Sequence, residues 1–236
     1  MNLTGKTVLV VGGSSGIGFG AAQAALEAGA SVTIASRSKQ KVEAAVARLG
    51  AGAEGQVLDT TDEPGVEAFF AGRNAFDHIV VSASKTKVAA VRELPLVDAY
   101  QSMNSKFWGA YRIARAAKIA EGGSLTLVSG FLSIRPRKGA AIQGAINAAV
   151  EGLTRGLALE FAPVRVNCVS PGLVATELYD GLDTAARKSM YDGAAARLPA
   201  GLVGTPEHIA VQIMAFIANP YITGSTVYVD GGGAIA

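Results

Sequence analysis

The segment from Lys6 to Leu26 constrains the fold more than any other part of the chain. Thr7 to Val11 is a run of β-branched and aliphatic residues, which predicts a strand buried on both faces. A glycine-rich turn, residues 12–18, follows directly, and strong helix formers from Ala21 to Leu26 predict a helix behind it. Free N–H groups at the start of such a helix attract anions, so this order predicts phosphate binding rather than a purely structural turn.

Length and composition favour one compact domain over residues 1–236. Half of the residues are hydrophobic and 17% are charged, which is typical of a compact enzyme-like fold. A net charge of +2, with scattered basic residues, argues against a nucleic-acid partner. No apolar run approaches membrane-spanning length and no signal peptide is evident, so we expect a cytoplasmic protein without a membrane partner.

Cysteine and histidine contribute little to the predicted chemistry. Cys168 is the single cysteine and lies in an apolar alternating segment, which favours an inert strand thiol over a nucleophile. His78 falls in a predicted strand and His208 at a predicted helix start, and no third ligand lies near either. We therefore expect no metal site.

Several motifs resemble those of the short-chain dehydrogenase/reductase family. The spacing Gly12-x-x-x-Gly16-x-Gly18 is similar to that family's glycine loop, with Val11 where the family usually has Thr. Residues 170–176 resemble its Pro-Gly turn with a nicotinamide-contacting Thr, and residues 222–232 resemble its closing strand. The resemblance covers essentially the whole chain. It implies an α/β fold: a single-domain Rossmann-type doubly wound parallel sheet of about seven strands with helices on both faces.

The hydrophobic pattern predicts the individual elements. We expect strands at residues 7–11, 31–35, 54–59, 76–81, 124–129 and 164–169, and a closing strand within 222–232. Helices are expected at 38–49, after Asp62, over about 95–120 and 139–161, and from about 204 onward. Residues 177–199, called the lid segment below, show an irregular pattern typical of a substrate-covering loop.

The end of the second predicted strand favours NADP over NAD. In dinucleotide folds an acid at this point binds a free ribose 2′-hydroxyl, whereas an Arg suits a 2′-phosphate. The sequence offers Ser36, Arg37 and Ser38 and no acid, although a solvated Arg37 at a helix start is the alternative. By resemblance, Asp59 binds the adenine amino group; an aspartate with a structural role in a turn is the alternative. The predicted NADP-binding residues are Gly12, Ser14, Ser15, Gly16, Ile17, Gly18, Ser36, Arg37, Ser38, Asp59, Thr60, Ser82, Ala83, Ser84, Asn147, Pro171, Gly172, Val174 and Thr176.

The catalytic pattern of the family is absent. By resemblance its serine, tyrosine and lysine fall on Gly130, Gln143 and Asn147, and no tyrosine of this chain has a lysine four residues later. Glutamine donates a hydrogen bond but gives up no proton near neutral pH. The remaining candidates for catalytic roles are Asn104 (the family's helix asparagine), Ser129, Gln143 and Asn147, and we expect little reduction of simple ketones.

Three functions remain open from the sequence. We favour an NADP(H)-dependent oxidoreductase with an atypical active site; the alternatives are a lyase, isomerase or cyclase on the same fold, or a noncatalytic NADP-binding sensor. The substrate is expected to be a small molecule. Five basic residues beyond the fourth and fifth strands suggest an anionic substrate unless they are ordinary solvated loop residues: Lys85, Lys87, Arg135, Arg137 and Lys138. By resemblance we expect a homotetramer or homodimer whose helices approach through Ala110, Ala114, Ala117, Ala148, Ala149 and Gly152.

Overall fold

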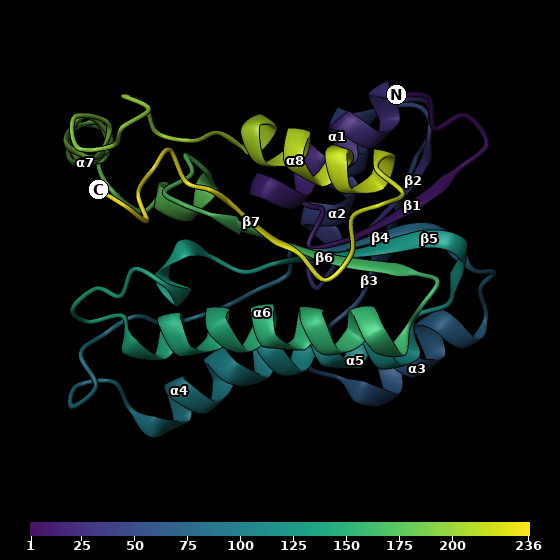
Figure 1. The fold of residues 1–236 in the computed structure, drawn as a ribbon, viewed down its shortest axis with the longest axis horizontal. Helices are drawn as coiled ribbons and strands as arrows, with labels where there is room; N and C mark the ends of the chain where they lie inside the picture. The colour runs from purple at the N-terminus through teal and green to yellow at the C-terminus, as the bar shows by residue number, and fades with distance from the viewer.

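A seven-stranded parallel sheet forms the centre of the molecule (Figure 1). The computed structural model describes the whole chain, Met1–Ala236, and its strands run in the order β3-β2-β1-β4-β5-β6-β7. The order reverses between β1 and β4, and in such sheets ligands bind at the carboxyl ends of the strands flanking this point. The strands are β1 (Thr7–Val11), β2 (Ser31–Ser36), β3 (Ala53–Val57), β4 (Phe76–Val81), β5 (Ile119–Val128), β6 (Arg165–Pro171) and β7 (Thr226–Val229).

Helices cover both faces of this sheet, which confirms the predicted fold class. One face is covered by α1 (Gly16–Glu27), α2 (Lys39–Leu49) and α8 (Pro206–Ala218). The other face is covered by α3 (Glu63–Ala71), α4 (Leu96–Met103), α5 (Gly109–Ala116) and α6 (Ala141–Glu160). In Figure 1 the lid segment lies beyond this layered body, at the end of the molecule where the chain also ends.

Each face of the sheet has its own hydrophobic core, because alternate strand residues point to opposite sides. Leu9 and Val11 join the core under α3, α5 and α6, which also holds Phe70 and Ile113. Their neighbours Val8 and Val10 join the other core, under α1 and α8. This double burial explains why the central strands are continuous apolar runs.

The predicted and observed elements differ most over residues 95–120 and in the lid segment. The helix expected over residues 95–120 consists of α4, a π-helical turn η1 (Asn104–Trp108) and α5, and it ends at Ala116 because β5 already begins at Ile119. The lid segment is not irregular throughout. It contains a short 3₁₀ turn η3 (Glu177–Tyr179) and the twelve-residue helix α7 (Thr184–Ala195), whose first turn is capped by Asp183.

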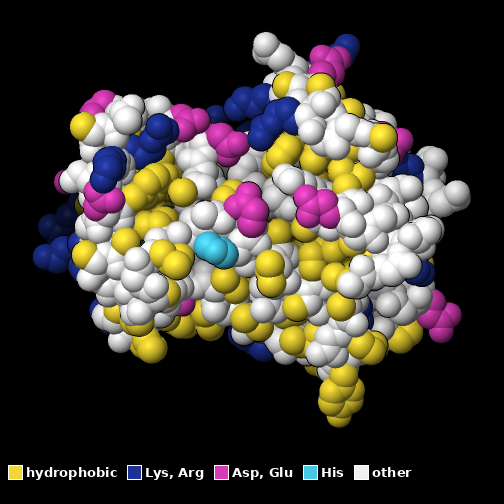
Figure 2. All heavy atoms as spheres, turned by 90° about the horizontal axis from the view of Figure 1, so that it is seen from above, with side chains coloured by type: hydrophobic (Ala, Val, Ile, Leu, Met, Phe, Trp, Pro, Cys, Tyr) yellow, Lys and Arg dark blue, Asp and Glu magenta, His cyan; other side chains and the backbone are white.

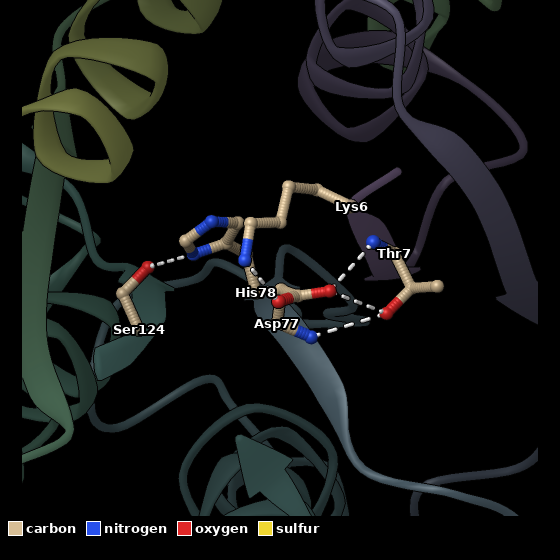
Figure 3. A network of polar contacts seen from close by, with 5 residues as sticks. All are labelled: Lys6, Thr7, Asp77, His78 and Ser124. Carbon is tan, nitrogen blue, oxygen red and sulfur yellow. Dashed lines mark hydrogen bonds and ion pairs between the residues drawn. The ribbon is translucent and has the colours of Figure 1, made fainter. Parts of the chain in front are cut away.

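A polar network joins the central strands β1, β4 and β5 away from their carboxyl ends, where the ligand site is predicted (Figure 3). Asp77 accepts hydrogen bonds from Lys6 Nζ, Thr7 N and Thr7 Oγ1, at 2.9 to 3.0 Å. The neighbouring His78 is buried and its Nδ1 lies 2.9 Å from Ser124 Oγ. Burial lowers the pKa of His78 to about 4.

His78 should make the fold sensitive to mild acid. Above about pH 6.5 the imidazole is neutral in the folded and in the unfolded protein. Between about pH 6.5 and 4 it binds a proton in the unfolded protein but not in the folded one. We expect the free energy of unfolding to fall by about 1–3 kcal/mol over this range. In His78→Asn this fall should be smaller by that amount, measured by urea unfolding at pH 4.5 and 7. Equal losses in both proteins would assign the sensitivity to carboxylates.

The outer surface carries mixed charges. Figure 2 shows the face seen from above Figure 1, where acidic and basic side chains lie interspersed among apolar ones without a continuous patch of either sign. None of the helices is long and apolar enough to cross a membrane.

Candidate active site

The glycine turn follows β1 and packs against the residues that follow β4, at the point where the strand order reverses. Gly12 has φ +89°, and a Cβ at this position would lie 2.5 Å from Ala83 N. A Cβ on Gly18 would lie 2.2 Å from Gly12 O, so the turn also packs against the start of α1 without space for a side chain. The predicted loops 12–18 and 82–84 are therefore neighbours, as a common ligand requires.

The first turn of α1 binds an anion of the protein itself. Gly16 N donates a hydrogen bond of 2.9 Å to Glu177 Oε2, from the start of the lid segment. Thr176 lies beside the same turn, because a Cβ on Gly16 would be 3.3 Å from Thr176 Cγ2. Gly16, Thr176 and Glu177 also line a pocket of about 390 Å³ between α1, α7 and the start of α8. The carboxylate occupies the type of position in which a helix N-terminus holds a phosphate.

Removing the Glu177 carboxylate should therefore strengthen the binding of a phosphate-bearing cofactor. We expect Glu177→Ala to tighten NADPH binding by about two- to fivefold, since a charge at a helix terminus contributes about 0.3–1 kcal/mol. Titration by nicotinamide fluorescence at low salt measures this. Asp180→Ala is the matched control, because Asp180 is an acid of the same segment that pairs with Arg187 and not with α1. Weaker binding in Glu177→Ala would instead make Glu177 a cofactor ligand.

The predicted adenosine end contains hydroxyl groups and one cation. Ser14 Oγ lies 2.9 Å from Ser36 Oγ, which ties the glycine turn to the end of β2. Arg37 is exposed, and no ion pair of the structure involves it. Ser38 caps α2 by accepting from Lys41 N. Asp59 Oδ1 accepts from the backbone N–H and hydroxyl of Thr61, so a structural role accompanies any contact with adenine.

The predicted catalytic positions meet beside the end of β5. A Cβ on Gly130 would lie 2.8 Å from Asn147 Nδ2, so Asn147 extends toward the space that a serine side chain would use. Gln143 stands one turn earlier on α6, and its Oε1 is buried without a hydrogen-bond partner. A buried acceptor without a partner costs free energy, as it also does for Thr126 Oγ1 and Thr226 Oγ1.

A buried lysine, which the sequence analysis did not identify, lies directly behind Asn147. Lys106 is 7% exposed, and its Nζ donates to Ser129 O at 2.6 Å and to Asn147 Oδ1 at 2.7 Å. Burial lowers the pKa of Lys106 to about 8, while the nearby Cys168 and Glu151 act against that shift. The family's lysine is absent at residue 147, but Lys106 of η1 places a cation beside that residue.

A second group missed from the sequence is Glu151, one turn of α6 beyond Asn147. It is 5% exposed, and its two oxygens accept hydrogen bonds from four hydroxyl groups. These donors are Ser129, Ser133 and Ser170 to Oε1, and Tyr228 to Oε2, over 2.7 to 3.1 Å. Ser129 links the two charged groups, since its carbonyl binds Lys106 and its hydroxyl binds Glu151.

These contacts occupy two of the predicted catalytic side chains. The hydroxyl of Ser129 is buried and donates to Glu151, so it does not replace the missing serine as a donor to substrate. Asn104 Oδ1 accepts from Arg112 Nη2 at 2.8 Å, and no hydrogen bond joins Asn104 to Asn147 or Lys106. Gln143 Oε1 and Asn147 Nδ2, in contrast to the Ser129 hydroxyl, have no hydrogen-bond partner within the chain.

The basic residues near the site differ in their surroundings. Lys87 pairs with Asp98 at 2.9 Å, and Arg135 donates to the carbonyl of Ala236. Lys85, Arg137 and Lys138 are exposed and form no ion pair. These three unpaired cations are compatible with an anionic substrate and with an ordinary solvated loop.

Known proteins resemble this chain over almost its whole length. The family described as Enoyl-(Acyl carrier protein) reductase matches residues 11–233. The short-chain dehydrogenase/reductase ucsE of Acremonium sp is 33% identical, over 98% of this chain and 96% of the relative. A small-chain dehydrogenase solved in complex with NADPH is 36% identical, with a TM-score of 0.86 over 98% of this chain and 99% of that chain.

One further structure is relevant to the catalytic positions. A short-chain oxidoreductase from Pseudomonas aeruginosa PAO1, described as containing an atypical catalytic center, is 27% identical with a TM-score of 0.91, over 100% of both chains. Since sequence and structure agree from the glycine turn to the closing strand, the chain belongs to the short-chain dehydrogenase/reductase family of oxidoreductases.

Proposed function

We propose that this protein is an NADP(H)-dependent oxidoreductase whose active site uses Gly130, Gln143 and Asn147 in place of serine, tyrosine and lysine. The observation that carries the cofactor assignment is the carboxylate of Glu177 on Gly16 N, because it marks an anion site at the glycine turn. Thr176 supports the nicotinamide end, since it lies beside the first turn of α1 and stands where the family has its nicotinamide-contacting Thr.

The preference for NADP over NAD rests on Arg37. Its guanidinium is exposed and free of carboxylates, and no acid stands at Ser36 to Ser38 to repel a phosphate. A phosphate paired with a guanidinium forms a charge-assisted hydrogen bond, often with two parallel contacts. The relative solved with NADPH is consistent with this preference.

Cofactor titration tests the assignment. We expect NADPH to bind at least roughly tenfold more tightly than NADH, which corresponds to about 1.4 kcal/mol. In Arg37→Ala the two affinities should become similar, mainly through weaker NADPH binding. Arg92→Ala is the matched control, because Arg92 is an exposed arginine outside the predicted cofactor residues. Equal affinities in the wild type, or an unchanged preference in Arg37→Ala, would refute the NADP assignment.

The bound cofactor would supply a hydride to an electrophilic carbon of the substrate. Gln143 stands where the family has its tyrosine and cannot protonate an oxygen at the same time, and the hydroxyl of Tyr228 is donated to Glu151. We therefore propose an acceptor that needs no such acid, for example a conjugated system protonated by water, an iminium, or a group served by a basic loop residue. Lys85, Arg137 and Lys138 would favour an anionic substrate.

We also propose that the protein forms a symmetric homodimer or homotetramer through the segment α4–η1–α5 and through α6. The α4–η1–α5 segment exposes large apolar side chains, namely Val97, Tyr100, Trp108 and Tyr111. Ala110 and Ala114, which the sequence suggested for close helix approach, are instead buried in the core of their own chain.

A further inference from the structure

Lys106 fixes the orientation of the Asn147 side chain. An ammonium group only donates, so its contact with Oδ1 turns the amide oxygen toward Lys106 and the amide nitrogen away from it. That nitrogen lies beside Gly130, where a Cβ would approach it to 2.8 Å. Asn147 is 2% exposed, and Nδ2 has no acceptor within the chain. A donor without a partner, carried by a buried side chain, therefore faces the space beside Gly130.

The cation also changes the strength of this donor. Lys106 and Asn147 are both buried, and charges in such surroundings act more strongly on their neighbours than in water. A positive charge on the oxygen side of an amide draws electrons from its N–H groups, so these become stronger hydrogen-bond donors. Glu151 and Cys168 are the other titratable groups facing Lys106, and Glu151 is separated from it by Ser129.

We propose that Lys106 positions and polarises the Asn147 amide, and that Asn147 Nδ2 donates a hydrogen bond to a substrate oxygen that becomes negative during the reaction. This inference rests on the proposed NADP(H)-dependent function. Asn147 is then a catalytic residue and Lys106 a positioning residue. The pair takes over the role that a serine hydroxyl plays in the family, and glycine at residue 130 leaves Nδ2 in place, whereas a Cβ there would displace it.

The charge of Lys106 selects among the acceptors. An iminium is cationic and would be repelled by the charge of Lys106, which only the Asn147 side chain separates from the substrate. The same charge would stabilise a developing oxyanion. Conjugated ketones fit best. When the β-carbon gains a hydride, the C=C pair forms a double bond to the carbonyl carbon and the C=O pair moves to the oxygen. Water later gives a proton to the α-carbon, which restores the carbonyl group. This sequence needs an oxyanion donor but no acid at the oxygen, which matches the groups present.

Two isosteric variants separate the role of Asn147 from mere packing. Asn147→Asp keeps an oxygen for Lys106 but replaces the donor by an acceptor, and Lys106→Met removes the charge at similar length. With saturating NADPH and cyclohexenone, we expect Asn147→Asp to lower kcat at least roughly 100-fold, the usual effect of losing one oxyanion donor. Asn74→Asp, an exposed amide far along the chain, is the control for the same chemical change.

A measurement without turnover tests Lys106. The side-chain amide signal of Asn147 in ¹⁵N-labelled protein, assigned by its loss in Asn147→Asp, should shift with a midpoint near pH 8. In Lys106→Met the signal should not titrate, and kcat for cyclohexenone should lose its fall above pH 8. A signal that does not titrate in the wild type would overturn the role of Lys106.

The remaining outcomes are distinct. Unchanged kcat in Asn147→Asp would overturn the role of Asn147, and faster reduction of 2-methyl-1-pyrroline than of cyclohexenone would overturn the substrate class. If the wild type binds NADPH but reduces neither, the substrate class is likewise refuted. Failure of the wild type to bind NADPH would refute the proposed function itself, whereas the amide titration would still decide whether Lys106 controls Asn147.

Discussion

The triple change Gly130→Ser, Gln143→Tyr, Asn147→Lys should leave the reduction of simple ketones as slow as in the wild type, although it restores the family's three catalytic residues. The obstacle is Lys106, whose Nζ lies 2.7 Å from the Asn147 side chain. A lysine at 147 would place two ammonium groups in one buried site, where like charges force one to lose its proton or move away.

Adding Lys106→Met to the triple change should raise ketone reduction by at least roughly 100-fold, because the restored tyrosine then supplies general acid catalysis worth about 10²–10⁴-fold. Adding Lys106→Arg instead is the control, since it keeps a cation behind residue 147 and should leave the rate low. The measurement is steady-state NADPH consumption with cyclohexanone. Efficient ketone reduction by the triple variant alone would prove that Lys106 does not obstruct the usual catalytic arrangement.

The position of Lys106 explains why part of the site was not predictable from sequence. In a regular α-helix the side chains of residues 104 and 106 point about 200° apart. If Asn104 faces the site, as the family resemblance implies, a regular helix would therefore direct Lys106 away from it. Here both lie in the π-helical turn η1, and such turns alter the direction of the side chains and often occur at functional sites. Asn104 binds Arg112, and Lys106 is the residue that reaches Asn147.

The elements that follow strict local rules were predicted correctly. β1, the glycine turn and α1 were found because a buried strand, a turn without space for Cβ atoms and a helix of strong helix formers leave few alternatives. β5 was placed five residues late, since Ile119 to Gly123 contains two glycines and lies at the end of an apparently helical pattern. No spacing in the sequence predicts Glu151, because its four donors come from the residue after β5, the 3₁₀ turn Phe131–Ser133, β6 and β7.

Glu151 should contribute more to stability than any other polar side chain near the site. In Glu151→Leu four hydroxyl groups lose their acceptor and Lys106 loses its nearest carboxylate, so we expect the free energy of unfolding to fall by roughly 3–5 kcal/mol. Urea unfolding at pH 7 measures this. Glu160→Leu, an exposed acid on the same helix, is the control and should change stability by no more than about 0.5 kcal/mol.

The variant Glu151→Gln separates the two contributions of this carboxylate. It keeps one oxygen for the serine hydroxyls but removes the charge that faces Lys106. If hydrogen bonding dominates, Glu151→Gln should lose less than half as much stability as Glu151→Leu. If the charge dominates, the two losses should be similar, and Lys106→Met should restore part of the stability in either background, because it removes the uncompensated cation. A loss below about 1 kcal/mol in Glu151→Leu would contradict both explanations, since even one buried hydroxyl left without a partner costs about that much.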